Sequence, residues 1–245
     1  MMSLKLWYDI RSRFYASLAF VALIAALHVA VFPFLKTLLG DWTNGVPILD
    51  SPEFRRLTED YSYYTTSRWF GEIGRSVLFG ILLTLGGVLA EGRSRAALIT
   101  LSLPVSRRAW VLGQMAAGAG ALLLLNLAGS LVVAAGGVIL GQPISAMQAV
   151  LGTLLLSVAA MPYLAVTLLA GAYTGERLLA GTAAIAFLVL TNKLDFFRAV
   201  RPWMPESLMN VLQSHELPWK ALLSIAIFTI AALAGAIREF KRTDY

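Results

Sequence analysis

The stretch Glu91–Gln114, EGRSRAALITLSLPVSRRAWVLGQ, separates two long apolar runs of the chain. The run that follows it, residues 109–139, contains no charged side chain, whereas the stretch itself contains four arginines: Arg93, Arg95, Arg107 and Arg108. Long apolar runs cross membranes as helices, and lysine and arginine gather in the loops on the cytoplasmic side. We therefore expect residues 91–108 to form a cytoplasmic loop between two membrane-spanning helices.

The composition of the whole chain agrees with a membrane protein. Of its 245 residues, 58% are hydrophobic and 14% are charged, and the mean hydropathy is +0.72. Soluble domains have about 45–50% apolar and about 25% charged residues, so most of this chain must face lipid. We predict an all-α membrane protein in which residues 1–245 form a single transmembrane domain.

Six apolar segments are candidates for spanning helices, because about 20 apolar residues cross the hydrocarbon core of a bilayer. They cover residues 15–36, 70–90, 109–139, 146–170, 178–193 and 220–237. Pro162 lies well inside the fourth segment and is expected to kink it, since proline removes a backbone hydrogen bond and clashes with the preceding turn. The third segment is rich in glycine and alanine, which let helix backbones approach closely in lipid.

Three further segments are not predicted to span the membrane. Residues 2–14 have apolar side chains three or four positions apart, which is typical of an amphipathic helix lying in the headgroup layer. Residues 37–67 form an outside segment with a short helix over 52–64, whose tyrosines suit the membrane edge. Residues 194–219 are too apolar for a free loop and too rich in proline for a span, so we expect a broken, re-entrant segment in the outer leaflet.

The distribution of positive charge gives the orientation. With both termini inside, the inside segments carry 11 Lys and Arg in 50 residues, and the outside segments carry 9 in 76. The density is thus higher inside, as the positive-inside rule requires. The net charge of +6 is explained by this bias, and we expect the lipid bilayer rather than nucleic acid as the partner.

Few polar residues fall inside the predicted spans. Asn126 and Ser130 lie four residues apart on the third span, and two interpretations apply: hydrogen bonding between helices, or contact with a transported molecule. With Gln148, they are our candidates for a substrate path. His28 lies alone in the first span, where packing or hydrogen bonding is favoured over a metal role.

The motifs of common enzyme classes are missing from the sequence. It contains no G-x-x-x-x-G-K-[ST], H-E-x-x-H or G-x-S-x-G pattern, which disfavours nucleotide cradling, zinc proteolysis and serine hydrolysis in this chain. Two histidines and no cysteine make a metal site unexpected. An intramembrane enzyme would have to use Glu72, Glu91 or His28, and we predict neither catalysis nor a cofactor in this chain.

The central loop carries the most distinctive pattern. Leu98 and Leu101 can share one apolar face of a short helix, and Pro104 ends that helix because the residue before proline disfavours helical angles. Ser106 can then cap the next helix, which runs into the third span. The apolar face can contact lipid headgroups or a groove on a partner protein, and the residues alone leave both open.

The loop resembles the one between the second and third spans in permeases of the ABC transporter type-2 family. Glu91, the run Leu103-Pro104-Val105-Ser106-Arg107 and Gly113 match the family pattern. Arg95-Ala96 replaces a Gly-Thr pair, and Gln114 replaces a lysine. The six-span layout, the interfacial N-terminal helix and the broken segment before the last span also fit.

This resemblance implies a membrane subunit of a transporter in the bacterial inner membrane, and a chain that itself binds no nucleotide. The loop would be a coupling helix seated in a cleft of a separate ATPase subunit, of which two bind, and ATP and Mg²⁺ would belong to that subunit. A second permease chain, identical or related, would complete the assembly, and export is the expected direction. The implied docking residues are Glu91, Arg93, Arg95, Leu98, Leu101, Pro104, Ser106, Arg107 and Arg108.

The resemblance also implies that residues 194–219 form part of an outer gate. One alternative belongs to another class of protein. The chain could be a membrane scaffold that transports nothing and uses the basic loop to recruit a cytoplasmic partner.

Overall fold

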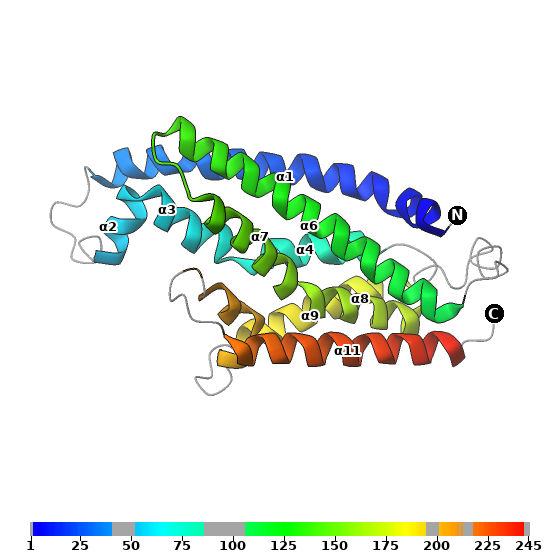
Figure 1. Cartoon of the computed structure of the whole chain (residues 1–245). Helices are drawn as coiled ribbons and strands as arrows, with labels where there is room; N and C mark the ends of the chain where they lie inside the picture. Colours follow the sequence, from blue (N-terminus) through cyan, green and yellow to red (C-terminus); the bar gives the residue numbers. More distant parts are fainter. Residues whose placement is uncertain are drawn as a thin grey trace.

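The computed structural model describes residues 2–40, 52–85, 106–194, 201–210, 212 and 218–242, and within these ranges every regular element is a helix (Figure 1). The all-α prediction is confirmed for this part of the chain. Residues 86–105, which include most of the predicted coupling loop, lie outside the described residues.

Four helical segments among the described residues are long and apolar enough to cross a membrane. They are Ile10–Leu35 within α1 (Met2–Gly40), α6 (Arg107–Ile139), Ala146–Thr174, which comprises α7 (Ala146–Ala159) and α8 (Met161–Thr174), and α11 (Trp219–Arg242). Two shorter apolar helices accompany them: α4 (Ile73–Thr84) and the Arg177–Thr191 part of α9 (Arg177–Leu194). The chain is therefore built as a helical membrane protein.

The predicted N-terminal amphipathic helix and the predicted first span form a single helix. Residues 2–14 were expected as a separate amphipathic helix, but α1 runs without interruption from Met2 to Gly40. Its first glycine or proline is Pro33, so nothing in the local sequence breaks the backbone earlier. The helix continues through Pro33, and Thr37 Oγ1 donates a hydrogen bond of 2.9 Å to the Pro33 carbonyl.

The first outside segment is more broken than predicted. Instead of one helix over 52–64, it contains α2 (Pro52–Glu59), α3 (Tyr61–Tyr64) and the π-helix η1 (Thr65–Phe70). Asp60 separates α2 from α3 with extended backbone angles, and its side chain accepts bonds from the amides of Ser62 and Tyr63 at 2.8 and 3.2 Å. This short acidic side chain therefore ends one helix and caps the next.

Two of the three tyrosines of this segment do not face outward as a membrane-edge belt would, and the third, Tyr63, is half-buried. Tyr61, Tyr64 and Trp69 are buried inside the protein. Tyr61 also donates a hydrogen bond from its hydroxyl to the Val133 carbonyl of α6, at 2.9 Å. A buried tyrosine needs such a partner for its hydroxyl, and the bond fixes α3 against α6.

The break predicted at Pro162 is present. α7 ends at Ala159, α8 begins at Met161, and Pro162 lies in the first turn of α8, where its missing amide hydrogen costs nothing. α8 ends at Gly175, whose φ of 62° is left-handed, and this allows the tight turn into α9. Two short 3-10 helices, η2 (Arg201–Trp203) and η3 (Pro205–Asn210), precede α11.

α6 occupies the centre of the molecule and packs against α1, α4, α7, α8 and α11. Its small residues allow close helix approach, as predicted, and the helix approached is α1. A Cβ added to Gly136 would lie 2.4 Å from Val29 Cγ2, and one added to Gly129 would lie 2.8 Å from Val21 Cγ1. Larger residues at these positions would force the two helices apart.

Side-chain hydrogen bonds place specific helix ends together. Arg13 of α1 donates to the Leu82 carbonyl near the end of α4, at 3.3 Å, and Arg107 at the start of α6 donates to the last turn of α11. At the opposite end, Gln142 in the turn after α6 accepts from the Tyr61 amide at 2.8 Å. The start of α1 and the start of α6 therefore share one end of the bundle, as Figure 1 shows.

Candidate functional site

Three of the predicted docking residues belong to the described structure. They are Ser106, Arg107 and Arg108; the other six, Glu91, Arg93, Arg95, Leu98, Leu101 and Pro104, lie outside the described residues. Ser106 caps α6 as predicted, since its backbone is extended and its Oγ accepts a hydrogen bond from the Ala109 amide at 3.2 Å. The first turn of α6 is thereby fixed at the point where the loop enters it.

Arg107 connects the start of α6 to the end of α11. Its Nη1 donates to the carbonyls of Phe240 and Lys241 at 2.8 and 3.2 Å, and its guanidinium carbon lies 5.8 Å from the centroid of the buried Phe240 ring. The last carbonyls of a helix lack partners within it, so a cation is well placed there. The two helix ends are held as one unit.

Arg108 faces away from this contact. It is exposed, and with Arg238 and Lys241 it lines an open cavity of about 420 Å³ between α6 and α11. Three cationic side chains therefore gather beside the entry of the loop into α6, which is the arrangement expected for an inside surface.

Asn126 and Ser130 belong to a chain of buried hydrogen bonds that we call the polar seam. Its members are Ser76 of α4, Asn126 and Ser130 of α6, and Thr153 and Ser157 of α7. Asn126 uses both ends of its amide: Oδ1 accepts from Ser76 Oγ at 2.9 Å, and Nδ2 donates to Ser157 Oγ at 3.0 Å. One turn further along α6, Thr153 Oγ1 donates to Ser130 Oγ at 2.8 Å.

Every member of the polar seam is less than 6% exposed. The described contacts thus agree with the first of the two interpretations, hydrogen bonding between helices. In lipid such bonds stabilise helix association because no water is present to replace them. The contact of Asn126 and Ser130 with a transported molecule stays a prediction.

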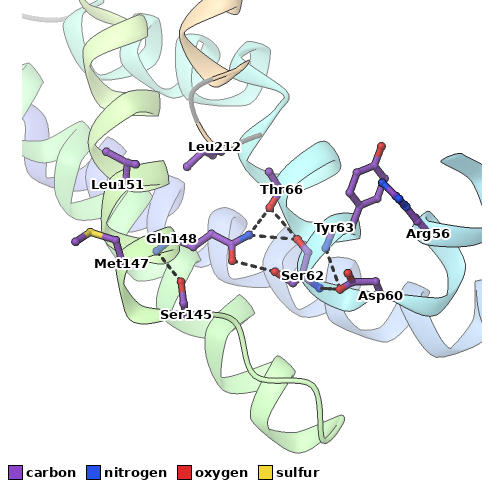
Figure 2. A pocket seen from close by; sticks show the side chains of 10 residues that line it. All are labelled: Arg56, Asp60, Ser62, Tyr63, Thr66, Ser145, Met147, Gln148, Leu151 and Leu212. Carbon is purple, nitrogen blue, oxygen red and sulfur yellow. Dashed lines mark hydrogen bonds between the residues drawn. The ribbon is translucent and has the colours of Figure 1, made fainter. Parts of the chain in front are cut away.

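Gln148 lies apart from the seam, in a pocket that we call the outer pocket. This cavity of about 580 Å³ lies between α7, the α2–η1 segment and Leu212 (Figure 2). Its lining residues are Arg56, Asp60, Ser62, Tyr63, Thr66, Ser145, Met147, Gln148, Leu151 and Leu212. Both predicted outside segments therefore contribute to one cavity.

Hydrogen bonds across the outer pocket join α7 to the α3–η1 segment. Gln148 Oε1 accepts from Ser62 Oγ at 2.9 Å, and Nε2 donates to the Ser62 carbonyl at 3.3 Å and to Thr66 Oγ1. Ser145 caps α7 by accepting from the Gln148 amide at 3.1 Å. Figure 2 shows the Gln148 side chain reaching across to Ser62 and Thr66.

The lining of the outer pocket combines charged, hydroxyl and apolar groups. Arg56 and Asp60 give both signs of charge, while Met147, Leu151 and Leu212 offer apolar surface. Such a mixed lining suits a molecule with polar and apolar parts. Of the lining residues, the sequence analysis named Gln148 alone as a candidate for the substrate path, because the α2–η1 residues and Leu212 meet α7 only through tertiary packing.

His28 is packed among aromatic rings. Its ring is stacked on Tyr64 with centroids 4.4 Å apart and lies 5.4 Å from Trp69. No group of three or more potential metal-ligating side chains gathers within the described ranges. The packing interpretation of His28 therefore agrees with the geometry. Glu72 forms an exposed ion pair with Arg68, in which Oε1 and Nη1 lie 3.6 Å apart.

Comparisons of the chain with protein-family models, with curated proteins and with solved structures found no match. The functional argument therefore depends on the residues and the geometry described above.

Proposed function

We propose that this chain is the six-span permease subunit of an ABC transporter of the type-2 family. In this proposal α4 and α9 complete the set of six spans, and both termini lie in the cytoplasm of a bacterial cell. Two ATPase subunits dock on residues 91–108, a second permease chain completes the path, and the substrate is exported across the inner membrane.

One observation carries the proposal: the Leu103–Arg107 motif leads directly into α6. Ser106 caps this helix and Arg107 joins it to α11, so a force that reaches Ser106 and Arg107 is passed directly to two spanning helices. Because α6 packs on five other helices, movement of its first turn would be passed to most of the molecule. These are the mechanical properties that a coupling segment needs.

The short helices are compatible with six spans. The described part of α4 has 12 residues, or about 18 Å, which is less than the hydrocarbon core of about 30 Å. The sequence stays apolar from Leu85 to Ala90, and the π-helix η1 precedes α4 on the other side. The Arg177–Thr191 part of α9 continues as helix to Leu194.

Affinity purification of the full chain from its native membrane, followed by identification of the co-eluting proteins, tests the proposal. We expect a P-loop ATPase in the eluate. Leu98→Asp and Leu101→Asp should each reduce its recovery by about tenfold, because a charge in an apolar docking face costs more than 1.4 kcal/mol. Leu178→Asp is the matched control, since Leu178 is 82% exposed and lies outside the loop.

Several outcomes would contradict the proposal. Unchanged recovery of the ATPase with both loop variants would refute the docking assignment. An eluate with a partner that hydrolyses no ATP would favour the membrane scaffold instead.

A further inference from the structure

A groove runs along the outside of α1 and α4, and we call it the lateral groove. It consists of two cavities of about 410 and 490 Å³ that share the lining residues Ile24, Glu72 and Arg75. The first cavity has a mixed lining, in which His28, Tyr64, Arg68 and Trp69 stand beside the apolar Leu27, Val31 and Leu35. The second is lined mainly by apolar side chains such as Phe20, Leu78, Leu82 and Ile185. One surface feature thus has a polar end and an apolar end.

The polar end of the lateral groove carries a fixed cation. Arg75 Nη2 donates to the Trp69 carbonyl at 2.6 Å, and its guanidinium carbon lies 3.6 Å from the centroid of the Trp69 ring. A planar guanidinium held by its ring stacking and one hydrogen bond keeps its other donors for further partners. Arg68 and Glu72 lie beside it, 3.6 Å apart. The lining of the two cavities therefore contains two cations and one anion.

Two ring nitrogens at this end lack hydrogen-bond partners. His28 Nε2 and Trp69 Nε1 are both buried and unpaired in the described structure, and both side chains line the polar cavity. The start of α4, between Glu72 and Arg75, also has no side-chain cap. Because both nitrogens are buried, they are enclosed by the protein beside the cavity, and the character of the ligand is set by the excess of positive charge. Arg68 and Arg75 favour an anion whose oxygens accept charge-assisted hydrogen bonds.

The apolar end continues away from Arg75 along α4. Leu78 and Leu82 lie on successive turns of that helix and are 47% and 45% exposed, while Phe20 of α1 and Ile185 of α9 are 55% and 46% exposed. The direction of the groove is therefore the direction of the helices, in which an acyl chain lies in a bilayer. Other helices also leave α1 largely uncovered, because only 17% of the apolar part of its spanning segment is buried inside the protein.

We propose that the lateral groove binds an anionic phospholipid of the surrounding bilayer. Its phosphate lies against Arg68 and Arg75, and one acyl chain follows Phe20, Leu78, Leu82 and Ile185. A second copy of this chain is a poorer occupant, because a two-fold interface brings the same patch of each copy together and so places two excess positive charges near each other.

Lipid retention by the purified full-length chain tests the proposal. The chain is incubated with an equimolar mixture of palmitoyl-oleoyl phosphatidylglycerol and palmitoyl-oleoyl phosphatidylcholine, and the bound lipids are counted by native mass spectrometry. We expect phosphatidylglycerol to be retained preferentially, with one molecule per chain. Arg68→Gln should weaken this retention by about tenfold, the loss expected for one charge-assisted contact, and Arg201→Gln, at an exposed arginine outside the groove, should leave it unchanged.

A second variant tests the apolar end without disturbing Arg75 and Trp69. Leu78→Trp fills the groove from its exposed side, so the protein should fold normally and lose retention of both lipids. Equal retention of the two lipids by the unaltered chain, or unchanged retention in Arg68→Gln and Leu78→Trp, would overturn the proposal.

A cross-linking experiment distinguishes lipid from a second copy. The chain contains no cysteine, so Leu82→Cys introduces a single thiol into the groove. We expect labelling by a lipid-soluble maleimide and no disulfide-linked dimer in the membrane. Efficient dimer formation through this thiol would show that another copy covers the groove and would overturn the assignment to lipid.

Discussion

Two adjacent residues of α4 serve two different polar regions. Ser76 faces inward and donates to Asn126 in the polar seam, whereas Arg75 stands at the lateral groove beside two unpaired ring nitrogens. The seam uses both ends of its central amide, and the groove leaves donors without protein partners. In a membrane, polar side chains between helices are satisfied by those helices, while polar side chains on the outer surface depend on whatever lies beside them.

Gly129 of α6 connects the two regions, and substituting it gives the largest expected effect. A Cβ at this position would lie 2.6 Å from Trp69 Cζ2 and 2.8 Å from Val21 Cγ1. Gly129→Ala should destabilise the fold by about 2 kcal/mol, because overpacking forces these buried side chains to shift. Thermal unfolding in detergent measures the loss.

Gly120→Ala is the matched control for this variant. It makes the same substitution in the same helix, and a Cβ there meets nothing within 4 Å. Equal unfolding temperatures for the two variants would show that Gly129 is not a point of close contact. A displaced Trp69 should also reduce phosphatidylglycerol retention in Gly129→Ala alone.

Removing the central amide of the seam should have a smaller effect. Asn126→Ala breaks the bonds to Ser76 and Ser157, and two interhelical hydrogen bonds in a membrane are worth about 1 kcal/mol. Leu127→Ala, at an adjacent residue that is 40% exposed, is the control, and thermal unfolding is again the measurement. If the polar seam and the lateral groove are independent, Asn126→Ala keeps its full lipid retention. A loss of lipid retention in this variant would contradict that independence.

The outer pocket gives the smallest expected effect. Gln148→Ala removes the bonds to Ser62 and Thr66, but these groups are only partly buried, so water replaces some of the lost contact and about 0.5 kcal/mol of stability is lost. Met147→Ala, at a residue that is 75% exposed, should change stability less. The rate of maleimide labelling is compared between Ser62→Cys alone and Ser62→Cys combined with Gln148→Ala. Faster labelling of the double variant would show that the pocket has opened. Identical rates would show that Gln148 does not restrict access to it.

Local patterns predicted several features correctly. The apolar runs gave the long helices, Pro162 gave the break between α7 and α8, and Ser106 gave the cap of α6. Each of these depends on residues close together in the chain, so the sequence contains the whole cause. The glycines of α6 belong here too, because a small residue in a span favours close packing wherever its partner comes from.

Features that depend on distant residues were missed. The break at Asp60 and the π-helix η1 allow Tyr61 and Trp69 to pack against α6. No local sequence pattern predicts these contacts. The contact of Arg75 with Trp69 was also missed, because this stacking requires the turn between η1 and α4. The partners of Asn126 lie 50 and 31 residues away, which explains why two interpretations remained open.

The length of α6 has a mechanical consequence. Its 33 residues span about 50 Å, and the polar seam holds it near the middle, at Asn126. Its first turn is bonded to the end of α11 through Arg107, and Gln142, just beyond its last turn, is bonded to the Tyr61 amide. α6 is therefore one continuous connection between the end of α11 and α3, the helix that carries Ser62 and Tyr63 of the outer pocket.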